Sequence, residues 1–225
     1  MGDKIIRPDK NICFSFYNKA IARWDNDIHS LGWGNTESQK VRFSIMSGIG
    51  DLNNKSILDI GCGFGDFFGF LGHNGIKPKK YLGIDLNPEM VNRSRRNYPD
   101  ATFEVADILE DDVDWSFDFV IASGIFALEA PNWAEIVERT LLKMHKISKI
   151  GFGVNFLSTY TTGDKQSESH FANPSEILSL VSSNISTNVV LKHDYRPNDF
   201  TIYVYKPLTH KKNTTNSDDA GHHTK

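Results

Sequence analysis

Three glycines alternate with other residues in Gly61-Cys62-Gly63-Phe64-Gly65, directly after a short apolar run at residues 56–60. Glycine lets the backbone turn sharply and lets a ligand approach the main chain closely. The helix expected next, over residues 66–73, would present free N–H groups and the positive end of its dipole to the loop. This arrangement suits a carboxylate or a phosphate, and the glycine pattern by itself does not choose between them.

Two acidic residues follow the next two apolar runs. Asp85 comes after residues 80–84, twenty positions beyond Gly65, and Asp107 comes after residues 102–105. In dinucleotide-binding folds an acidic residue at the position of Asp85 accepts hydrogen bonds from ribose hydroxyls. Ligands bind where parallel strands end at the carboxyl edge of a sheet, so the glycine loop and both acids are predicted to share one site.

Strand and helix signals alternate along most of the chain, which favours an α/β fold with helices on both faces of a mostly parallel sheet. Strands are predicted at residues 56–60, 80–84, 102–105, 117–122 and 149–156, and helices at residues 66–73, 87–97, 133–146 and 174–181. Asn87 is a plausible N-cap followed by Pro88 at the first helical position. After five strand–helix units, the runs 188–192 and 200–205 predict an antiparallel hairpin.

Four segments together resemble the motifs of class I S-adenosylmethionine-dependent methyltransferases. Ile57-Leu58-Asp59-Ile60-Gly61-Cys62-Gly63-Phe64-Gly65 is similar to the first motif, and residues 81–90, 103–108 and 117–123 are similar to the next three, in order and spacing. The glycine spacing also differs from the G-x-G-x-x-G of nicotinamide enzymes, and an acidic residue precedes it. The resemblance implies a single-domain sheet of seven strands in the order 3-2-1-4-5-7-6. It also implies S-adenosylmethionine as cofactor and S-adenosylhomocysteine as product.

The resemblance assigns cofactor contacts residue by residue. Asp59 would hold the ammonium group, and Asp85 would take the two ribose hydroxyls. The remaining expected contacts are Gly61, Gly63 and Gly65 with Cys62 as a small filler beside the methionine part, Leu86 and Ile108 on the adenine faces, Asp107 at the adenine amino group, and Ala122 and Ser123 near the sulfonium.

The methyl acceptor is predicted to be a small molecule, methylated on O or N. The fourth strand ends in Ser123-Gly124-Ile125-Phe126, which lacks the Pro-Pro pair of enzymes that methylate exocyclic amines on DNA or glutamine on protein. The net charge is −3 and no basic stripe is present, which argues against nucleic acid as partner. A methyltransferase acting on protein or nucleic acid and a non-catalytic S-adenosylmethionine-binding module remain as alternatives. A nicotinamide oxidoreductase, which the glycine spacing disfavours, is the third.

The acceptor pocket is expected from residues 14–43 and from the loop at residues 157–170. Aromatic residues of the first segment could form a lid over a flat or apolar acceptor. Candidate substrate contacts are Tyr17, Trp33 and Phe126, and Arg42 could pair with a carboxylate of the cofactor or of the substrate.

A general base is needed only if the acceptor must lose a proton. His170 and His193 are the candidates, because imidazole titrates near neutral pH, and Tyr160 is a weaker one. A carboxylate or an already neutral amine would need no base.

The 225 residues are divided into a helical cap at residues 1–50, the cofactor-binding domain at residues 51–206 and a polar, disordered tail at residues 207–225. Cys13 and Cys62 are too few for a disulfide framework or a four-thiolate metal site, and no metal is predicted. No signal peptide or membrane-spanning run is seen, so a cytoplasmic protein without a membrane partner is expected. The sequence does not assign an oligomeric state.

Overall fold

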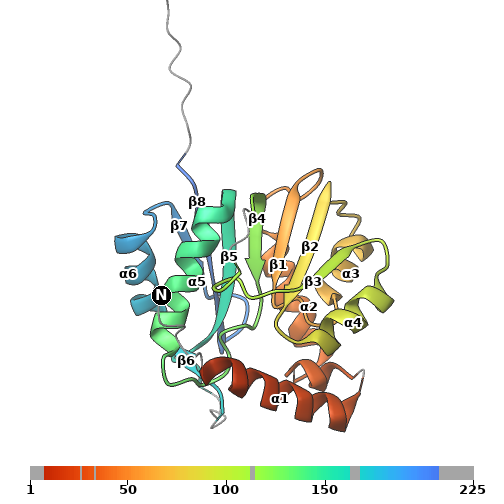
Figure 1. Cartoon of the computed structure of the whole chain (residues 1–225). Coiled ribbons are helices and arrows are strands. Elements are labelled where there is room, and N and C mark those ends of the chain that lie inside the picture. Colours follow the sequence, from red (N-terminus) through yellow and green to blue (C-terminus); the bar gives the residue numbers. More distant parts are fainter. Residues whose placement is uncertain (1–7, 26, 33, 112–114, 163–167, 208–225) are drawn as a thin grey trace, which may run out of the picture.

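The computed structural model describes residues 8–25, 27–32, 34–111, 115–162 and 168–207. A single sheet forms its middle (Figure 1). The strands are β1 (Ser56–Ile60), β2 (Lys80–Asp85), β3 (Thr102–Val105), β4 (Phe117–Ala122), β5 (Ser148–Ser158), β6 (Phe171–Ala172), β7 (Val189–Lys192) and β8 (Asp199–Tyr205). They follow the order β3-β2-β1-β4-β5-β8-β7, with the two-residue β6 paired to the end of β5. When the two-residue β6 is left out and the strands are renumbered, this is the predicted order 3-2-1-4-5-7-6. Strand β8 is antiparallel to β5 and to β7, as the predicted hairpin requires.

Helices cover both faces of the sheet (Figure 1). They are α1 (Pro8–Trp24), the 3-10 turn η1 (Ile28–Leu31), α2 (Thr36–Ser47), α3 (Asp66–His73), α4 (Pro88–Asn97), α5 (Trp133–Ile147) and α6 (Pro174–Asn184). Helices α2, α3 and α4 pack one face through a cluster that includes Met46, Leu71 and Val91. Helices α5 and α6 pack the other through a cluster that includes Leu141 and Val181.

Local sequence explains where two of these helices begin. Asn87 caps α4 by accepting a hydrogen bond from the backbone N–H of Glu89 at 2.9 Å, and Pro88 occupies the first turn, as predicted. Asn173 caps α6 in the same way through the N–H of Ser175. Such a cap stabilises a helix by about 1 kcal/mol, because it satisfies a backbone donor that the helix itself leaves unpaired.

One connection departs from the predicted strand–helix alternation. The described residues between β3 and β4, at positions 106–111 and 115–116, form no helix. This segment carries Asp107, Glu110 and Asp111 and offers few apolar side chains for a helix face. It remains at the edge of the sheet as an acidic loop.

Register places the carboxyl ends of four strands at one edge. Ile60 at the end of β1 is paired with Ile84 of β2 and with Ala122 of β4, and Asp85 is paired with Val105 of β3. Helix α1 lies across this edge of the sheet (Figure 1). The fold therefore brings the N-terminal segment over the strand ends where the motif residues meet.

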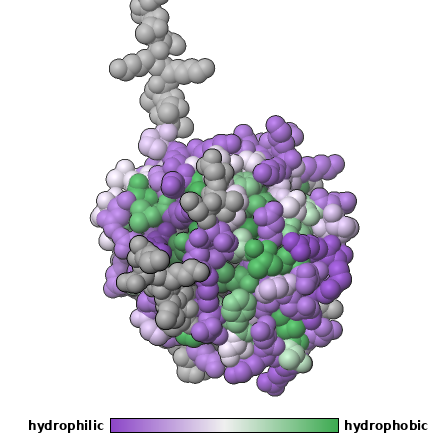
Figure 2. Space-filling view, in the orientation of Figure 1, coloured by the Kyte–Doolittle hydropathy of each residue, from purple (hydrophilic) through white to green (hydrophobic). Residues whose placement is uncertain are grey.

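Polar and apolar residues are unevenly distributed on the surface. The face drawn in Figure 2 is mostly hydrophilic at its margins, with hydrophobic residues gathered toward its middle. Within the described part of the chain, no helix combines the length and the apolar character that crossing a membrane requires.

Candidate functional site

A cavity lies at the carboxyl edge of β1 to β4, beneath α1. Its volume is about 170 Å³. The predicted site residues that line it are Tyr17, Asp59, Gly61, Cys62, Gly63, Asp85, Leu86, Asp107, Ile108, Ser123 and Phe126. Segments far apart in the sequence thus converge on one cavity, as the motif order predicted.

The glycine loop requires glycine for steric reasons. Gly61 has φ +70°, and a Cβ there would come within 2.4 Å of Cγ2 of Ile125. Gly65 has φ +83°, and a Cβ there would come within 2.8 Å of the Tyr98 ring, so this glycine serves packing and does not line the cavity. The N–H groups of Gly61 and Cys62 both donate to the carbonyl oxygen of Ile84, at 2.8 and 3.0 Å, and hold the loop against β2. Burial raises the pKa of the Cys62 thiol, which keeps this side chain neutral beside the cavity.

Asp59 is a buried carboxyl group with one protein partner. Only 3% of the residue is exposed, and Tyr81 Oη donates to its Oδ2 at 2.6 Å. Burial raises the pKa of Asp59 to about 7, although the Tyr81 hydrogen bond acts in the opposite direction. A cation bound beside Asp59 would stabilise its ionised form.

Asp85 is held in one orientation by backbone donors. Its Oδ2 accepts from the N–H of Gly63 at 3.0 Å, and its Oδ1 accepts from the N–H of Asn87 at 2.9 Å. Burial raises the pKa of this carboxyl group against the effect of these bonds. The end of β2 therefore places a second acidic side chain, fixed by backbone donors, in the lining of the cavity.

Asp107 is the third carboxylate, and it has a partner that sequence reasoning missed. Its Oδ1 accepts from the N–H of Leu109 at 2.9 Å, and Lys10 Nζ of α1 lies 2.6 Å from its Oδ2. Lys10 also contacts Glu110. Burial acts to lower the pKa of Lys10, but hydrogen bonds to Asp107 and Glu110 raise it above its usual value. No local pattern links residue 10 with residue 107, so only the fold could show this contact.

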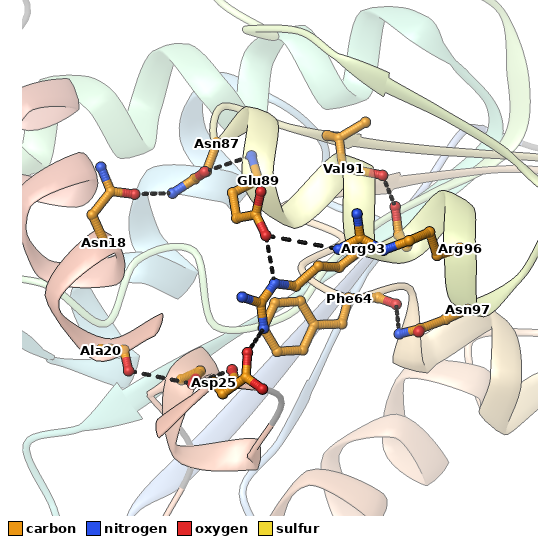
Figure 3. Close-up of polar contacts among 12 residues, drawn as sticks. Asn18, Ala20, Asp25, Phe64, Asn87, Glu89, Val91, Arg93, Arg96 and Asn97 are labelled. Atoms are coloured by element: carbon orange, nitrogen blue, oxygen red, sulfur yellow. Dashed lines mark hydrogen bonds and ion pairs between the residues drawn. The ribbon is translucent and has the colours of Figure 1, made fainter. Parts of the chain in front are cut away.

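Helix α1 and the residue after it contact the N-cap and the body of α4 at two further points (Figure 3). Asn87 Nδ2 donates to Asn18 Oδ1 at 2.8 Å, and Arg93 Nη1 lies 2.9 Å from Asp25 Oδ1. The Arg93 guanidinium also stands 5.2 Å above the Phe64 ring of the glycine loop. Tyr17 of α1 lines the cavity, so these contacts hold α1 in place over it.

The chemistry of these groups defines the ligand that fits. Four acidic side chains, Asp59, Asp66, Asp85 and Asp107, line a cavity whose other walls are largely apolar, including Leu86 and Ile108. Asp66 accepts a hydrogen bond from Gln39, and the other three complement a cationic molecule that carries an ammonium group, a diol and an aromatic amine. S-adenosylmethionine has all three, so the residues present fit this cofactor.

Known proteins support the same conclusion. A methyltransferase domain family matches residues 57–146. A Mycobacterium tuberculosis protein named "Putative methyltransferase Rv1506c" is 33% identical over 159 residues, which are 67% of this chain and 93% of that protein. The chain belongs to the class I S-adenosylmethionine-dependent methyltransferases. It is therefore an enzyme of this class with S-adenosylmethionine as its cofactor.

Two other similarities complete the comparison. The methyltransferase is 27% identical over 161 residues to a malonyl-[acyl-carrier protein] O-methyltransferase of Hamiltonella defensa, covering 68% of this chain and 57% of that protein. Its fold is similar to magnesium protoporphyrin IX methyltransferase from Synechocystis PCC 6803 with bound S-adenosylhomocysteine. The TM-score is 0.63 and the identity 14%, over 88% of this chain and 100% of that one.

A second hollow of about 660 Å³ adjoins the cofactor cavity of the methyltransferase. The two share four lining residues, Tyr17, Leu31, Gly124 and Leu128. Arg42, predicted to meet a carboxylate, lines this second hollow and not the first, and its Nη2 lies 2.6 Å from Oδ1 of Asp199. Ala122 is fully buried at the end of β4 and lines neither. Trp33 is outside the described residues, as are residues 163–167 of the expected acceptor loop and residues 208–225 of the expected tail.

The three candidate bases lie outside both linings. His170 stacks on Trp133, with ring centroids 3.7 Å apart, and its Nδ1 lies 2.8 Å from Glu129 Oε2. His193 Nε2 is 2.8 Å from Ser158 Oγ, and the Tyr160 ring packs edge-on against His193. Each has a partner outside the lining of both hollows, and a catalytic role for any of them stays a prediction.

Asn155 is a site residue that the sequence analysis did not single out. It is 3% exposed on β5, accepts from the N–H of Gly124 at 2.8 Å and donates to Ser123 Oγ at 3.3 Å. It therefore fixes the end of β4 between the two hollows. A lone amide inside the apolar run Gly-Phe-Gly-Val-Asn-Phe-Leu was the available signal.

Proposed function

We propose that this methyltransferase transfers a methyl group to the O or N atom of a small molecule bound in the second hollow, by direct displacement at the sulfonium. The observation that carries the proposal is the junction of the two hollows at Tyr17, Leu31, Gly124 and Leu128. An acceptor in the second hollow would meet the cofactor cavity at this junction. Bound S-adenosylmethionine supplies the electrophilic methyl group.

Three carboxylates would divide the binding of the cofactor. Asp59 would hold the ammonium group, Asp85 the ribose hydroxyls, and Asp107 the adenine amino group, with Leu86 and Ile108 on the ring faces. The proposal is supported by their placement along one cavity and by the backbone donors that orient Asp85 and Asp107. The glycine loop would border the methionine part, because Gly61 and Gly63 leave no side chain between it and the backbone.

The chain's remaining task would be to hold the acceptor near the methyl group and keep water out. We assign the N-terminal segment, residues 1–50, as the cap that does this, since Phe14 and Tyr17 of α1 line the cofactor cavity and Phe16 and Tyr17 line the second hollow. Two similar enzymes are named for the acceptors magnesium protoporphyrin IX and malonyl-[acyl-carrier protein], and in both names the methylated group belongs to a small chemical unit, free in the first and attached to a carrier protein in the second. A cytoplasmic location stays part of the proposal.

Turnover tests this function. The protein is incubated with S-adenosylmethionine and pools of small carboxylic acids, phosphates, phenols and amines, and S-adenosylhomocysteine is quantified by mass spectrometry. We expect product formation with at least one small-molecule pool and loss of it in Asp85→Ala. Asp100→Ala, which removes an exposed carboxylate in the turn before β3, should keep it. Product formed only with protein or nucleic acid fractions would contradict the proposal, and cofactor binding without turnover on any pool would favour a non-catalytic module.

A further inference from the structure

Asn155 is a buried amide at the place where the two hollows meet. It lies on β5 between the apolar residues Val154 and Phe156, is 3% exposed and lines the second hollow. Its hydrogen-bond partners are at the end of β4, where Ser123 lines the cofactor cavity and Gly124 lines both hollows. Burying an amide costs free energy unless its polar atoms find partners. What this amide offers a ligand depends on which of its atoms the protein already uses.

Two hydrogen bonds fix the orientation of the Asn155 amide. The N–H of Gly124 donates to Oδ1 at 2.8 Å, and Nδ2 donates to Ser123 Oγ at 3.3 Å. A backbone N–H only donates, so the amide oxygen faces Gly124 and the NH2 group is the donor to Ser123. An amide NH2 group has two hydrogens and accepts none. Among the residues that the structure describes, this group contacts no acceptor besides Ser123 Oγ, so one N–H of Asn155 remains for a ligand.

Ser123 supplies a second hydrogen at the same place. Its Oγ accepts from Asn155, and the described part of the chain provides no acceptor for its hydroxyl hydrogen. The hydroxyl group can rotate to donate to a ligand. Since Ser123 lines the cofactor cavity and Asn155 lines the second hollow, a ligand atom at the boundary would meet donors from both sides. Ser123 Oγ also keeps a lone pair, so Asn155 is the residue that discriminates between ligand atoms.

Groups that could take a proton from a methyl acceptor are placed elsewhere or are already engaged. No histidine occurs in the described lining of either hollow, and the three candidate bases contact partners outside both. In the second hollow, Asp199 is ion-paired with two arginines, and Glu168 is exposed. In the cofactor cavity, Asp66 accepts from Gln39, and the other acids are those assigned to the cofactor. An acceptor that needs no base fits this arrangement best.

Three kinds of methyl acceptor differ in what they present to the donors. A neutral nitrogen nucleophile has one lone pair, which must point at the methyl carbon, so it offers nothing to the N–H of Asn155. A neutral hydroxyl group accepts a hydrogen bond but has a proton to lose. An ionised oxygen has no proton, and it has lone pairs both for the methyl carbon and for the hydrogens of Asn155 and Ser123. Only the third kind matches the donors and the lack of a base together.

We propose that Asn155 selects the methyl acceptor, and that the atom it selects is an oxygen that arrives ionised, as a carboxylate or a phenolate. This inference rests on the proposed function, because it names the atom that is methylated in the same site. An oxygen lone pair forms the bond to the methyl carbon while the carbon–sulfur bond breaks and its electron pair stays with sulfur. The positive sulfonium and the negative oxygen become a neutral thioether and a neutral ester or ether, and no proton is transferred.

Matched aromatic probes test this selection without requiring the natural acceptor. Isotope-labelled protein is saturated with S-adenosylhomocysteine and titrated with benzoate, nitrophenolate, aniline and benzyl alcohol, at a pH where the first two are ionised and aniline is neutral. NMR follows the side-chain amide signals of Asn155. We expect at least one ionised probe to shift these signals and to bind about tenfold more tightly than aniline and benzyl alcohol, as one charge-assisted hydrogen bond would give. Benzoate against nitrophenolate distinguishes a carboxylate from a phenolate acceptor.

Two substitutions locate the effect. Asn155→Asp keeps an oxygen for the N–H of Gly124 but replaces the NH2 group by a second acceptor, so the preference for ionised oxygen should disappear. Ser123→Ala removes one neutral donor and should weaken binding of the ionised probes about threefold. Asn92→Asp is the matched control, because it adds the same charge at an exposed position of α4 and should leave the preference unchanged. Thermal melting of each variant shows whether the fold is retained.

Three results would overturn the proposal. The first is that the ionised probes bind no more tightly than aniline or benzyl alcohol. The second is that they bind without shifting the Asn155 signals, and the third is that the preference survives in folded Asn155→Asp. If Asn155→Asp does not fold, the third test passes to Ser123→Ala, where undiminished binding of the ionised probes counts against the proposal.

Titration with S-adenosylhomocysteine is done first on the same samples. Absence of that binding in the unmodified protein would contradict the proposed function, whereas normal cofactor binding without a preference for ionised oxygen would contradict only the role of Asn155.

Discussion

The cofactor cavity and the second hollow share a wall but are built in different ways. The first comes from consecutive strand ends and their short loops, so Asp59, Asp85 and Asp107 occur in chain order within three strand–loop units. The second joins α2 to the C-terminal hairpin, and its central pair, Arg42 and Asp199, is separated by 157 positions. Local motifs can therefore indicate a cofactor, whereas the lining of the second hollow depends on tertiary structure.

The largest expected effect is on the cofactor side. Asp85→Ala removes a carboxylate proposed to accept two hydroxyl hydrogen bonds and leaves the N–H groups of Gly63 and Asn87 without their acceptor. Because hydrogen bonds to a charged group contribute about 1.5–3 kcal/mol each, affinity for S-adenosylhomocysteine should fall by at least about 100-fold. Isothermal titration calorimetry measures it, with Asp100→Ala as control. An affinity within threefold of the unmodified protein would contradict the role of Asp85.

The glycine loop and helix α3 offer a matched pair of substitutions. Gly61→Ala introduces a Cβ at φ +70° and 2.4 Å from Ile125 Cγ2, so it should lower the free energy of unfolding by about 2 kcal/mol. Gly72→Ala places a Cβ in open space within a helix and should raise it by about 0.5–1 kcal/mol. Urea denaturation compares the two. Equal effects would mean that the loop tolerates a side chain.

The pH dependence of cofactor binding isolates Asp59. Its pKa of about 7 in the cofactor-free protein means that a proton must leave before the carboxylate can pair with an ammonium group. Affinity for S-adenosylhomocysteine should therefore rise about tenfold between pH 6 and pH 8, following the ionised fraction. Asp59→Asn should bind more weakly and without this rise. A flat profile in the unmodified protein would exclude Asp59 from ammonium binding.

The same group has an opposite effect on stability. Burial raises the pKa of Asp59 above its ordinary value of 3.8, so the unfolded chain releases this proton at a lower pH than the folded one does. The contribution of Asp59 to stability should consequently fall as pH rises from about 4 to about 7 and change little above that. Melting curves of the cofactor-free protein and of Asp59→Asn measure this contribution as their difference. An Asp59 contribution that increases with pH would contradict it.

The smallest expected effect concerns helix α1, which covers the cofactor cavity. Lys10→Met removes the contact of α1 with Asp107 and Glu110. Because such partly exposed ion pairs contribute up to about 1 kcal/mol, S-adenosylhomocysteine should dissociate about two- to fivefold faster. Lys19→Met, on an exposed position of the same helix, should leave the rate unchanged, and stopped-flow displacement measures both. Equal rates in the two variants would mean that α1 does not retain the ligand.

What the sequence predicts well depends on neighbours in the chain. The helix cap at Asn87, Pro88 and Glu89 depends on contacts over a few residues, so it follows from local chemistry. The turn at Gly61 belongs to a glycine loop of fixed spacing and follows in the same way. The hairpin also follows from its two β-rich runs and the turn between them. The strand order came from the resemblance to the methyltransferase family and not from the apolar runs.

What the sequence predicts poorly depends on partners that the fold supplies. Arg42 was expected to meet a carboxylate, but the one it contacts belongs to the protein itself, on β8. His170 is an ordinary candidate base from its residue type, yet its stacking on Trp133 and its contact with Glu129 depend on how the β4–α5 region packs against the loop before β6. Spacing carries no information about such long-range pairs.

The most direct test of the cofactor assignment is calorimetric titration of the purified protein with S-adenosylhomocysteine beside NADH. The acidic lining of the cavity predicts saturable one-to-one binding of S-adenosylhomocysteine and no detectable binding of NADH, whose phosphates would be repelled. Binding of NADH, or no binding of S-adenosylhomocysteine to the folded protein, would contradict the cofactor site described above.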